Sequence, residues 1–130
     1  MNKIKFNVWD KPNQKLISWE NILKENNLEL FIDKTKIPLQ FTGIYDKENT
    51  ELYADDLIQA EIKGTDYIFR IYSAPGGFAI KPPHWAKDIR DLGFGDELIL
   101  EPLLDIQTST WVSQSCKKVG NIYEGLKINL

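Results

Sequence analysis

The chain begins with a regular alternation of apolar and polar residues. Over residues 3–9 (KIKFNVW) the period is two, which predicts a strand with one buried face. Residues 10–14 (DKPNQ) are typical of a turn, because Pro fixes φ and Asp and Asn bond their own backbone. Apolar residues resume over 15–19 (KLISW). Residues 3–19 are therefore expected to form a β-hairpin.

The middle of the chain repeats the strand pattern. Strands are predicted over 37–44, 51–53, 57–63, 67–72 and 78–81. The segments between them are rich in turn-forming residues, including Asp46 to Thr50, Gly64-Thr65-Asp66 and Pro75-Gly76-Gly77. This succession predicts several antiparallel hairpins.

Residues 20–36 allow two interpretations. One or two helical turns over 21–27 would bury Ile22 and Leu23. A turn at Asn26-Asn27 would instead lead into a strand over 28–32, and this is the interpretation that we favour.

Residues 82–97 are the least regular part of the chain. They open with Pro82-Pro83-His84-Trp85 and contain two glycines, which indicates a loop or an insertion with room for one short helix. Pro102 interrupts the apolar run that follows. Further strands are predicted over 109–113 and 118–123.

Short strands separated by turns at intervals of about ten residues indicate a mainly β protein, either a barrel or a sandwich. The 130 residues fit one domain, and no internal repeat or low-complexity linker divides them. We expect a single domain over 1–130. It comprises an N-terminal hairpin region over 1–36 and a barrel over 37–130, with the irregular insertion around 82–105.

The charge balance argues against a dedicated binder of duplex DNA, which usually has a basic excess. The net charge is -3, from 16 Lys and Arg against 19 Asp and Glu. The distribution is uneven, with +2 over residues 1–37 and -5 over residues 38–130. A local basic face near the N-terminus therefore stays open, with Lys3, Lys5, Lys11 and Lys15 as its candidate residues.

The cysteine and histidine content limits the possible chemistry. Cys116 is the single cysteine, which excludes an intrachain disulfide, and with the single histidine His84 it cannot complete a zinc site. We expect no cofactor and no metal. The chain has no apolar segment of signal-peptide or membrane-spanning length, so we expect a full-length cytoplasmic protein with no membrane partner.

Three stretches carry a family resemblance. They are residues 5–10 (KFNVWD), residues 39–47 (LQFTGIYDK) continuing through 51–58 (ELYADDLI), and residues 119–124 (VGNIYE). In this order they resemble the YopX family of small phage and prophage proteins. The resemblance implies an all-β, SH3-like small barrel from a mobile element in a bacterial host. It supplies no catalytic residues.

The chain departs from the family pattern at two turns. The family commonly has Asn-Gly in its central turn, where this chain has Asn49-Thr50. Because the β-branched Thr resists positive φ, we expect a longer turn or another turn type. The family often has Gly at the place of Asp55, so this corner is also expected to differ.

The pair Asp55-Asp56 is a candidate for Mg²⁺ or Ca²⁺ binding. Adjacent residues of a strand point to opposite faces, however, so the two carboxylates would not converge. We expect instead a corner at the start of a strand, with one carboxylate accepting backbone N–H bonds and the other in solvent.

The irregular segment carries the candidate partner-binding residues. Pro82-Pro83 favours an extended exposed segment, and a Trp at a loop tip makes a good protein anchor, although Trp85 could equally pack on the barrel. The acids from Asp88 to Asp105 form either a solvated face or a patch that docks on a basic protein. The candidate surface consists of Pro83, His84, Trp85, Asp88 and Asp91.

These features favour a non-enzymatic protein-interaction module, with self-association as one form of it. The alternative is a nucleic-acid-associated accessory protein using the basic N-terminal residues, with salt-sensitive binding. The many aromatic residues are more simply explained as core residues than as a surface on which bases stack. A base-stacking surface would also need basic neighbours, for which Arg70 and Lys63 are the best candidates. A third hypothesis, an enzyme, would need a concave site with perturbed carboxylates, and we identify no catalytic residues.

Overall fold

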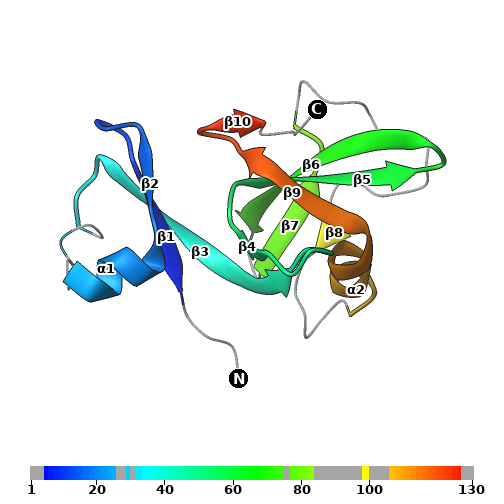
Figure 1. Cartoon of the computed structure of the whole chain (residues 1–130), viewed down its shortest axis with the longest axis horizontal. Coiled ribbons are helices and arrows are strands. Elements are labelled where there is room, and N and C mark those ends of the chain that lie inside the picture. Colours follow the sequence, from blue (N-terminus) through cyan, green and yellow to red (C-terminus); the bar gives the residue numbers. More distant parts are fainter. Residues whose placement is uncertain are drawn as a thin grey trace. The chain divides into compact units, whose positions relative to one another are not determined.

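The fold is mainly β and divides into two compact units, Met1–Phe41 and Thr42–Leu130. A computed structural model describes residues 5–25, 29, 32–74, 77–83, 98–99 and 106–126 (Figure 1). No helix among these residues has the length and apolar character needed to cross a membrane.

The first unit is built on the predicted hairpin. Its elements are β1 (Phe6–Asp10), β2 (Lys15–Ile17), α1 (Trp19–Glu25) and the first part of β3 (Lys36–Tyr45). β1 lies between β2 and β3 and is antiparallel to both. The hairpin predicted over 3–19 is confirmed over Phe6–Ile17, because Asp10 pairs with Lys15 across the turn. Trp19, predicted to end the second strand, belongs to α1 instead, and residues 3 and 4 lie outside the described residues.

The core of the first unit lies between this hairpin and α1. Val8 and Ile22 are buried together, and Ile17 and Trp19 pack against them. α1 begins after Ser18, whose Oγ accepts the N–H of Asn21 at 3.3 Å, as expected of an N-cap. The helical interpretation of residues 21–27 is therefore confirmed as far as Glu25, and residues 26 and 27 lie outside the described residues. Ile22 is buried as expected, but the expectation that Leu23 is buried is wrong, because it is exposed.

Only Glu29 and Ile32 are described within the strand predicted over 28–32, and at both positions the strand prediction is wrong. Glu29 and Ile32 belong to a turn, in which the N–H groups of Ile32 and Asp33 both donate to the carbonyl of Glu29. Asp33 then accepts the N–H of Thr35 at 2.9 Å. These local bonds compete with strand formation and turn the chain toward β3.

The second unit is a six-stranded antiparallel sheet, curled into a half-barrel, with one helix (Figure 1). The strand order is β10-β9-β5-β6-β7-β8, so β5 pairs with β9 from a distant part of the sequence. The bounds of these strands and the helix are β5 (Asp56–Ile62), β6 (Thr65–Ala74), β7 (Gly77–Lys81), β8 (Leu98–Ile99), α2 (Ile106–Ser115), β9 (Cys116–Asn121) and β10 (Gly125–Leu126). One further strand, β4 (Glu51–Tyr53), pairs with β3 in the four-stranded sheet of order β2-β1-β3-β4.

Alternation along the strands of this sheet separates a core face from an outer face. Ile58, Phe69, Ile71 and Ile80 are buried on the core face, together with Val112 of α2. The intervening residues of β5, β6 and β7 lie on the outer face. The strands predicted over 51–53, 57–63, 67–72, 78–81 and 118–123 are confirmed within a few residues at each end. Of the turn predicted over 75–77, residues 75 and 76 lie outside the described residues.

The strand predicted over 109–113 is wrong, because these residues belong to α2. Thr and Val favour strands, but that preference depends strongly on context. Here the helical conformation directs Val112 into the core and lets Trp111 meet Phe69 edge-on, with ring centroids 5.7 Å apart. Packing against the sheet therefore overrides the local preference.

Candidate functional site

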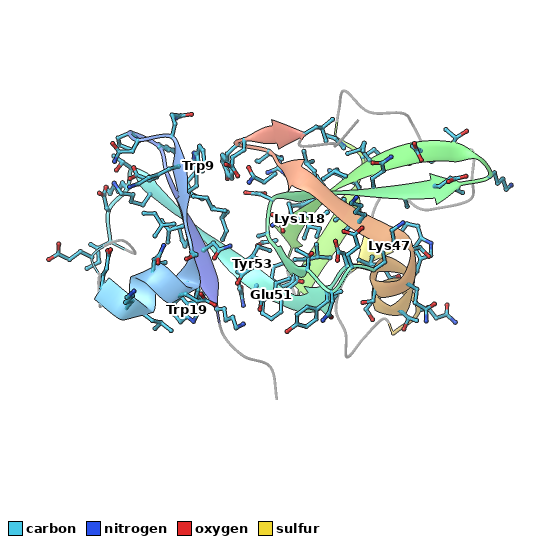
Figure 2. All side chains as sticks on the ribbon, viewed as in Figure 1. Trp9, Trp19, Lys47, Glu51, Tyr53 and Lys118 are labelled. Atoms are coloured by element: carbon cyan, nitrogen blue, oxygen red, sulfur yellow. The ribbon has the colours of Figure 1, made fainter. Side chains whose placement is uncertain are left out.

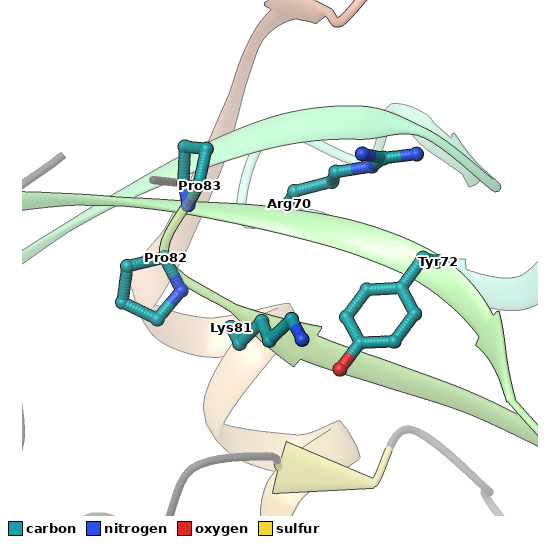
Figure 3. A pocket seen from close by; sticks show the side chains of 5 residues that line it. All are labelled: Arg70, Tyr72, Lys81, Pro82 and Pro83. Atoms are coloured by element: carbon teal, nitrogen blue, oxygen red, sulfur yellow. The ribbon is translucent and has the colours of Figure 1, made fainter. Parts of the chain in front are cut away.

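A groove of about 350 Å³ opens on the outer face of β6 and β7 (Figure 3). Its lining combines two cations, an aromatic ring and two prolines: Arg70, Tyr72, Lys81, Pro82 and Pro83. Arg70 and Lys81 are direct cross-strand partners, and Tyr72 follows Arg70 on the same face of β6. Phe69 and Ile71 fill the core on the other face, whereas Arg70, Tyr72 and Lys81 lie on this face. Their cross-strand neighbours Leu57 and Ala79 are buried.

Arg70 is held in place by a carboxylate from the corner that precedes β5. Its Nη2 and Nε atoms donate to Oδ1 of Asp55 at 2.8 and 3.2 Å. The second oxygen of Asp55 accepts the hydroxyl proton of Tyr123 at 2.6 Å. Burial and this bond to Asp55 raise the pKa of Tyr123, so the phenol stays a hydrogen-bond donor.

The backbone at this corner takes a conformation that favours glycine. Asp55 has a φ of 68°, in the left-handed region that glycine adopts freely and Asp tolerates better than most residues. Its N–H donates to Ile71 and its carbonyl accepts from Ile122, so the backbone is fixed on both sides. The conformation is thus the one that glycine favours, and the added side chain supplies the contact to Arg70.

Asp55 and Asp56 do not converge on a common point. Asp56 is buried, accepts the N–H of Tyr53 at 2.7 Å and pairs with Lys118 at 3.2 Å. The predicted corner is confirmed, and Asp56 is the residue that bonds the backbone. The expectation that the other carboxylate lies in solvent is wrong, because Asp55 binds Arg70 and Tyr123.

The carboxylate of Asp46 links the turn before β4 to strand β9 by hydrogen bonds. Its Oδ1 accepts the N–H groups of Glu48 and Thr50 at 2.9 and 2.8 Å, and its Oδ2 accepts the N–H of Lys118 at 2.8 Å. Figure 2 labels Lys118 on β9. This carboxylate is therefore a structural anchor.

The same turn confirms the expectation that Asn49-Thr50 forms a longer turn than a two-residue Asn-Gly turn would. Asn49 has a φ of 66°, and Thr50 is not among the residues with positive φ. The N–H of Asn49 donates to the carbonyl of Asp46, and the N–H of Asp46 donates to the carbonyl of Thr50. The turn thus spans five residues with a single left-handed position, which Asn tolerates and Thr avoids.

The described residues offer little for metal binding or thiol chemistry. They contain no group of three or more His, Cys, Asp or Glu side chains that could hold a metal ion. Cys116 is fully buried, and burial raises the pKa of its thiol to about 12. A thiol in this environment is a poor nucleophile.

Of the candidate partner-binding residues, Pro83 lines the groove. His84, Trp85, Asp88 and Asp91 lie outside the described residues. The signal for the other groove residues was present in the sequence. The strands predicted over 67–72 and 78–81 pair with Ala74 opposite Gly77, and that register places Arg70 opposite Lys81.

The candidate lysines of the first unit do not gather at one place. Lys5 precedes β1 and lies over the ring of Phe41, with Nζ 5.3 Å from the centroid. Lys11 and Lys15 are exposed at the opposite end of β1, about 20 Å along the strand from Lys5 at about 3.3 Å per residue. Lys3 lies outside the described residues.

Comparison with known proteins places the chain in a family. The model of the YopX protein family matches residues 5–126. The chain belongs to the YopX family. Its fold is similar to that in the crystal structure of protein EF1440 from Enterococcus faecalis, with a TM-score of 0.55 and 15% sequence identity. The match covers 95% of this YopX protein and 96% of EF1440. At this identity the similarity concerns the fold alone, and no curated protein matches the chain.

Proposed function

We propose that this YopX protein is a non-enzymatic protein-binding module of phage or prophage origin that acts in the cytoplasm of a bacterial host. The groove on β6 and β7 is the proposed contact surface. The observation that carries the proposal is the gathering of Arg70, Tyr72, Lys81 and two prolines around one concavity on the face opposite the core. Arginine and aromatic side chains are enriched where proteins bind one another.

In the part of the second unit that the structure describes, the side-chain chemistry supports binding over catalysis. The carboxylates of Asp46, Asp55 and Asp56 already accept bonds from backbone, Tyr or Arg donors. Cys116 is inert through burial. What the groove offers is a fixed cation, a second cation and an apolar wall, which are features of recognition.

A capture experiment with matched variants tests this function. The tagged full chain, the double variant Arg70→Gln/Lys81→Gln and the control Lys63→Gln are incubated with host lysate, with and without nuclease. Lys63 lies in the exposed turn between β5 and β6 and has no part in the groove, so its variant removes a charge without touching the surface.

The proposal expects a protein that survives nuclease, is captured by the wild type and by Lys63→Gln, and is lost with the double variant. Equal capture by all three proteins would place the contact elsewhere and overturn the role of the groove. Loss of every partner with nuclease would instead favour the nucleic-acid alternative. Light scattering on the purified full chain tests whether a second copy of the chain is the partner.

A further inference from the structure

We propose that the groove receives a carboxylate from a short acidic segment of the partner protein. This inference rests on the proposed protein-binding function and adds the chemistry of the ligand. Arg70 and Lys81 are the recognising cations, and Tyr72 with the two prolines forms the apolar wall beside them.

The first argument is an uncompensated positive charge. Arg70 and Lys81 face one another directly across β6 and β7, and like charges in that position destabilise a sheet. Asp55 offsets one of the two charges by its ion pair with Arg70 at 2.8 Å. Among the described residues no acidic side chain pairs with Lys81, so the cluster keeps one net positive charge. A ligand carboxylate would neutralise it.

The second argument is the fixed orientation of Arg70. Asp55 binds its Nε and Nη2 atoms and is itself held by Tyr123. The Nη1 atom donates no hydrogen bond to any described residue, which leaves donors of the planar guanidinium for a ligand. A guanidinium that is already ordered loses less entropy when it binds a carboxylate.

The third argument concerns the place of Lys81. Figure 3 shows its side chain extending toward Tyr72, and its Nζ lies 5.0 Å from the centroid of that ring. This cation–π contact holds the ammonium within the groove instead of in bulk solvent. Pro82 and Pro83 follow Lys81 and line the groove, but they have no backbone N–H to donate. A ligand carboxylate at this wall is therefore bound by the side chains of the two cations.

The same features disfavour a nucleic-acid strand as the ligand. Lys81 covers one face of the Tyr72 ring, where a base would otherwise stack. Further along the same face, Glu61 and Asp66 are exposed and lie opposite one another. A long polyanion that followed β6 away from the groove would meet these two acids. A short acidic segment would avoid them.

Peptide binding tests the ligand chemistry. The probes are a short fluorescein-labelled peptide rich in Glu, the same peptide with each Glu replaced by Gln, and labelled oligo(dT). Affinity for the folded full chain is measured by fluorescence anisotropy at low and at physiological salt, because charge-driven binding weakens as salt rises. Lys81→Gln leaves the Asp55–Arg70 pair intact, so it tests the groove even if Arg70→Gln perturbs folding.

The Glu peptide should bind at least about tenfold more tightly than the Gln peptide, as expected when one charge-assisted contact is lost. Lys81→Gln and Arg70→Gln should each weaken the Glu peptide several-fold, while Lys63→Gln should leave its affinity unchanged. Equal binding of the two peptides, or no binding of either at millimolar concentration, would overturn the ligand chemistry.

Failure of the ligand chemistry and failure of the function give different results. If the capture experiment still requires the groove while the Glu peptide does not bind, the protein-binding function stands and only the carboxylate inference falls. If captured proteins ignore the groove variants, the function itself falls. Binding of oligo(dT) that depends on Arg70 and Lys81, without binding of the Glu peptide, would replace both proposals with nucleic-acid binding.

Discussion

Replacing Asp46 with Ala should cost a large part of the stability of the second unit. The carboxylate is buried and accepts three backbone N–H bonds, from Glu48, Thr50 and Lys118. A hydrogen bond to a charged group contributes about 1.5–3 kcal/mol. Glu48 and Thr50 are exposed, so in the variant water can bond their N–H groups and recover part of the lost free energy. Lys118 is half-buried within β9, so its N–H is less accessible to water.

These contributions give a loss of about 3–5 kcal/mol for Asp46→Ala, against a total of about 5–15 kcal/mol for an ordinary domain. Asp46→Asn should lose less, about 1–3 kcal/mol, because its amide oxygen can still accept from Glu48 and Thr50. Its NH₂ group would then face the N–H of Lys118, where two donors meet.

Equilibrium unfolding in urea, followed by tryptophan fluorescence, measures these differences. With a slope of about 1.5 kcal/mol per molar, Asp46→Ala should lower the midpoint by about 2–3 M. Asp66→Ala is the matched control, since it removes an exposed acid and should change stability by no more than about 0.5 kcal/mol. A loss below about 1 kcal/mol for Asp46→Ala, or an Asn variant less stable than the Ala variant, would refute the argument.

Three further outcomes can be measured. Burial raises the pKa of Asp56 to about 6 despite its ion pair, so the folded protein keeps a proton that the unfolded chain has lost. Stability should therefore fall by about 2 kcal/mol as the pH rises from 4 to 7, and urea titrations of Asp56→Asn should lack this fall. With the pKa of Cys116 at about 12, its reaction with a disulfide reagent at pH 8 should be about a thousandfold slower in the native protein than in the unfolded one, and comparable rates would contradict its burial. In Gly120→Ala the new Cβ would overlap the carbonyl of Gly125 at a φ of 145°, so thermal melts should show a loss of at least about 2 kcal/mol, whereas Gly43→Ala, at a φ of 83° with open space around it, should lose only about 1 kcal/mol.

The sequence predicted those parts of the fold whose determinants are local. The turn after Asp10 carries its own Pro and Asn residues, and the flanking strands alternate cleanly. The strand predicted over 109–113 contains Thr110 and Val112, whose residue types favour strands, yet these positions are helical. Their helix is decided by burial of Val112 against a sheet whose strands lie far away in the sequence, which a local pattern does not contain.

The candidate site also combines a contact set by local sequence with contacts between distant positions. The pairing of Arg70 with Lys81 follows from one short hairpin, so it was within reach of the sequence. The bond from Tyr123 to Asp55 joins positions 68 residues apart and depends on the pairing of β5 with β9, whose register shifts between Leu57 and Ile58. A register shift of this kind has no local sequence signature. The contacts of Asp55 with Arg70 and Tyr123 are therefore visible only in the three-dimensional structure.

The Asp46 anchor also has a consequence for synthesis on the ribosome. Its partner Lys118 lies 72 positions later in the chain, and at about 5–20 residues per second this delay lasts roughly ten seconds. During that interval β5 can pair with β6, while its other edge waits for β9. An open edge of this kind is a template for pairing with another nascent chain. Products of interrupted translation that lack β9 should therefore be the species that aggregate first and that chaperones retain longest.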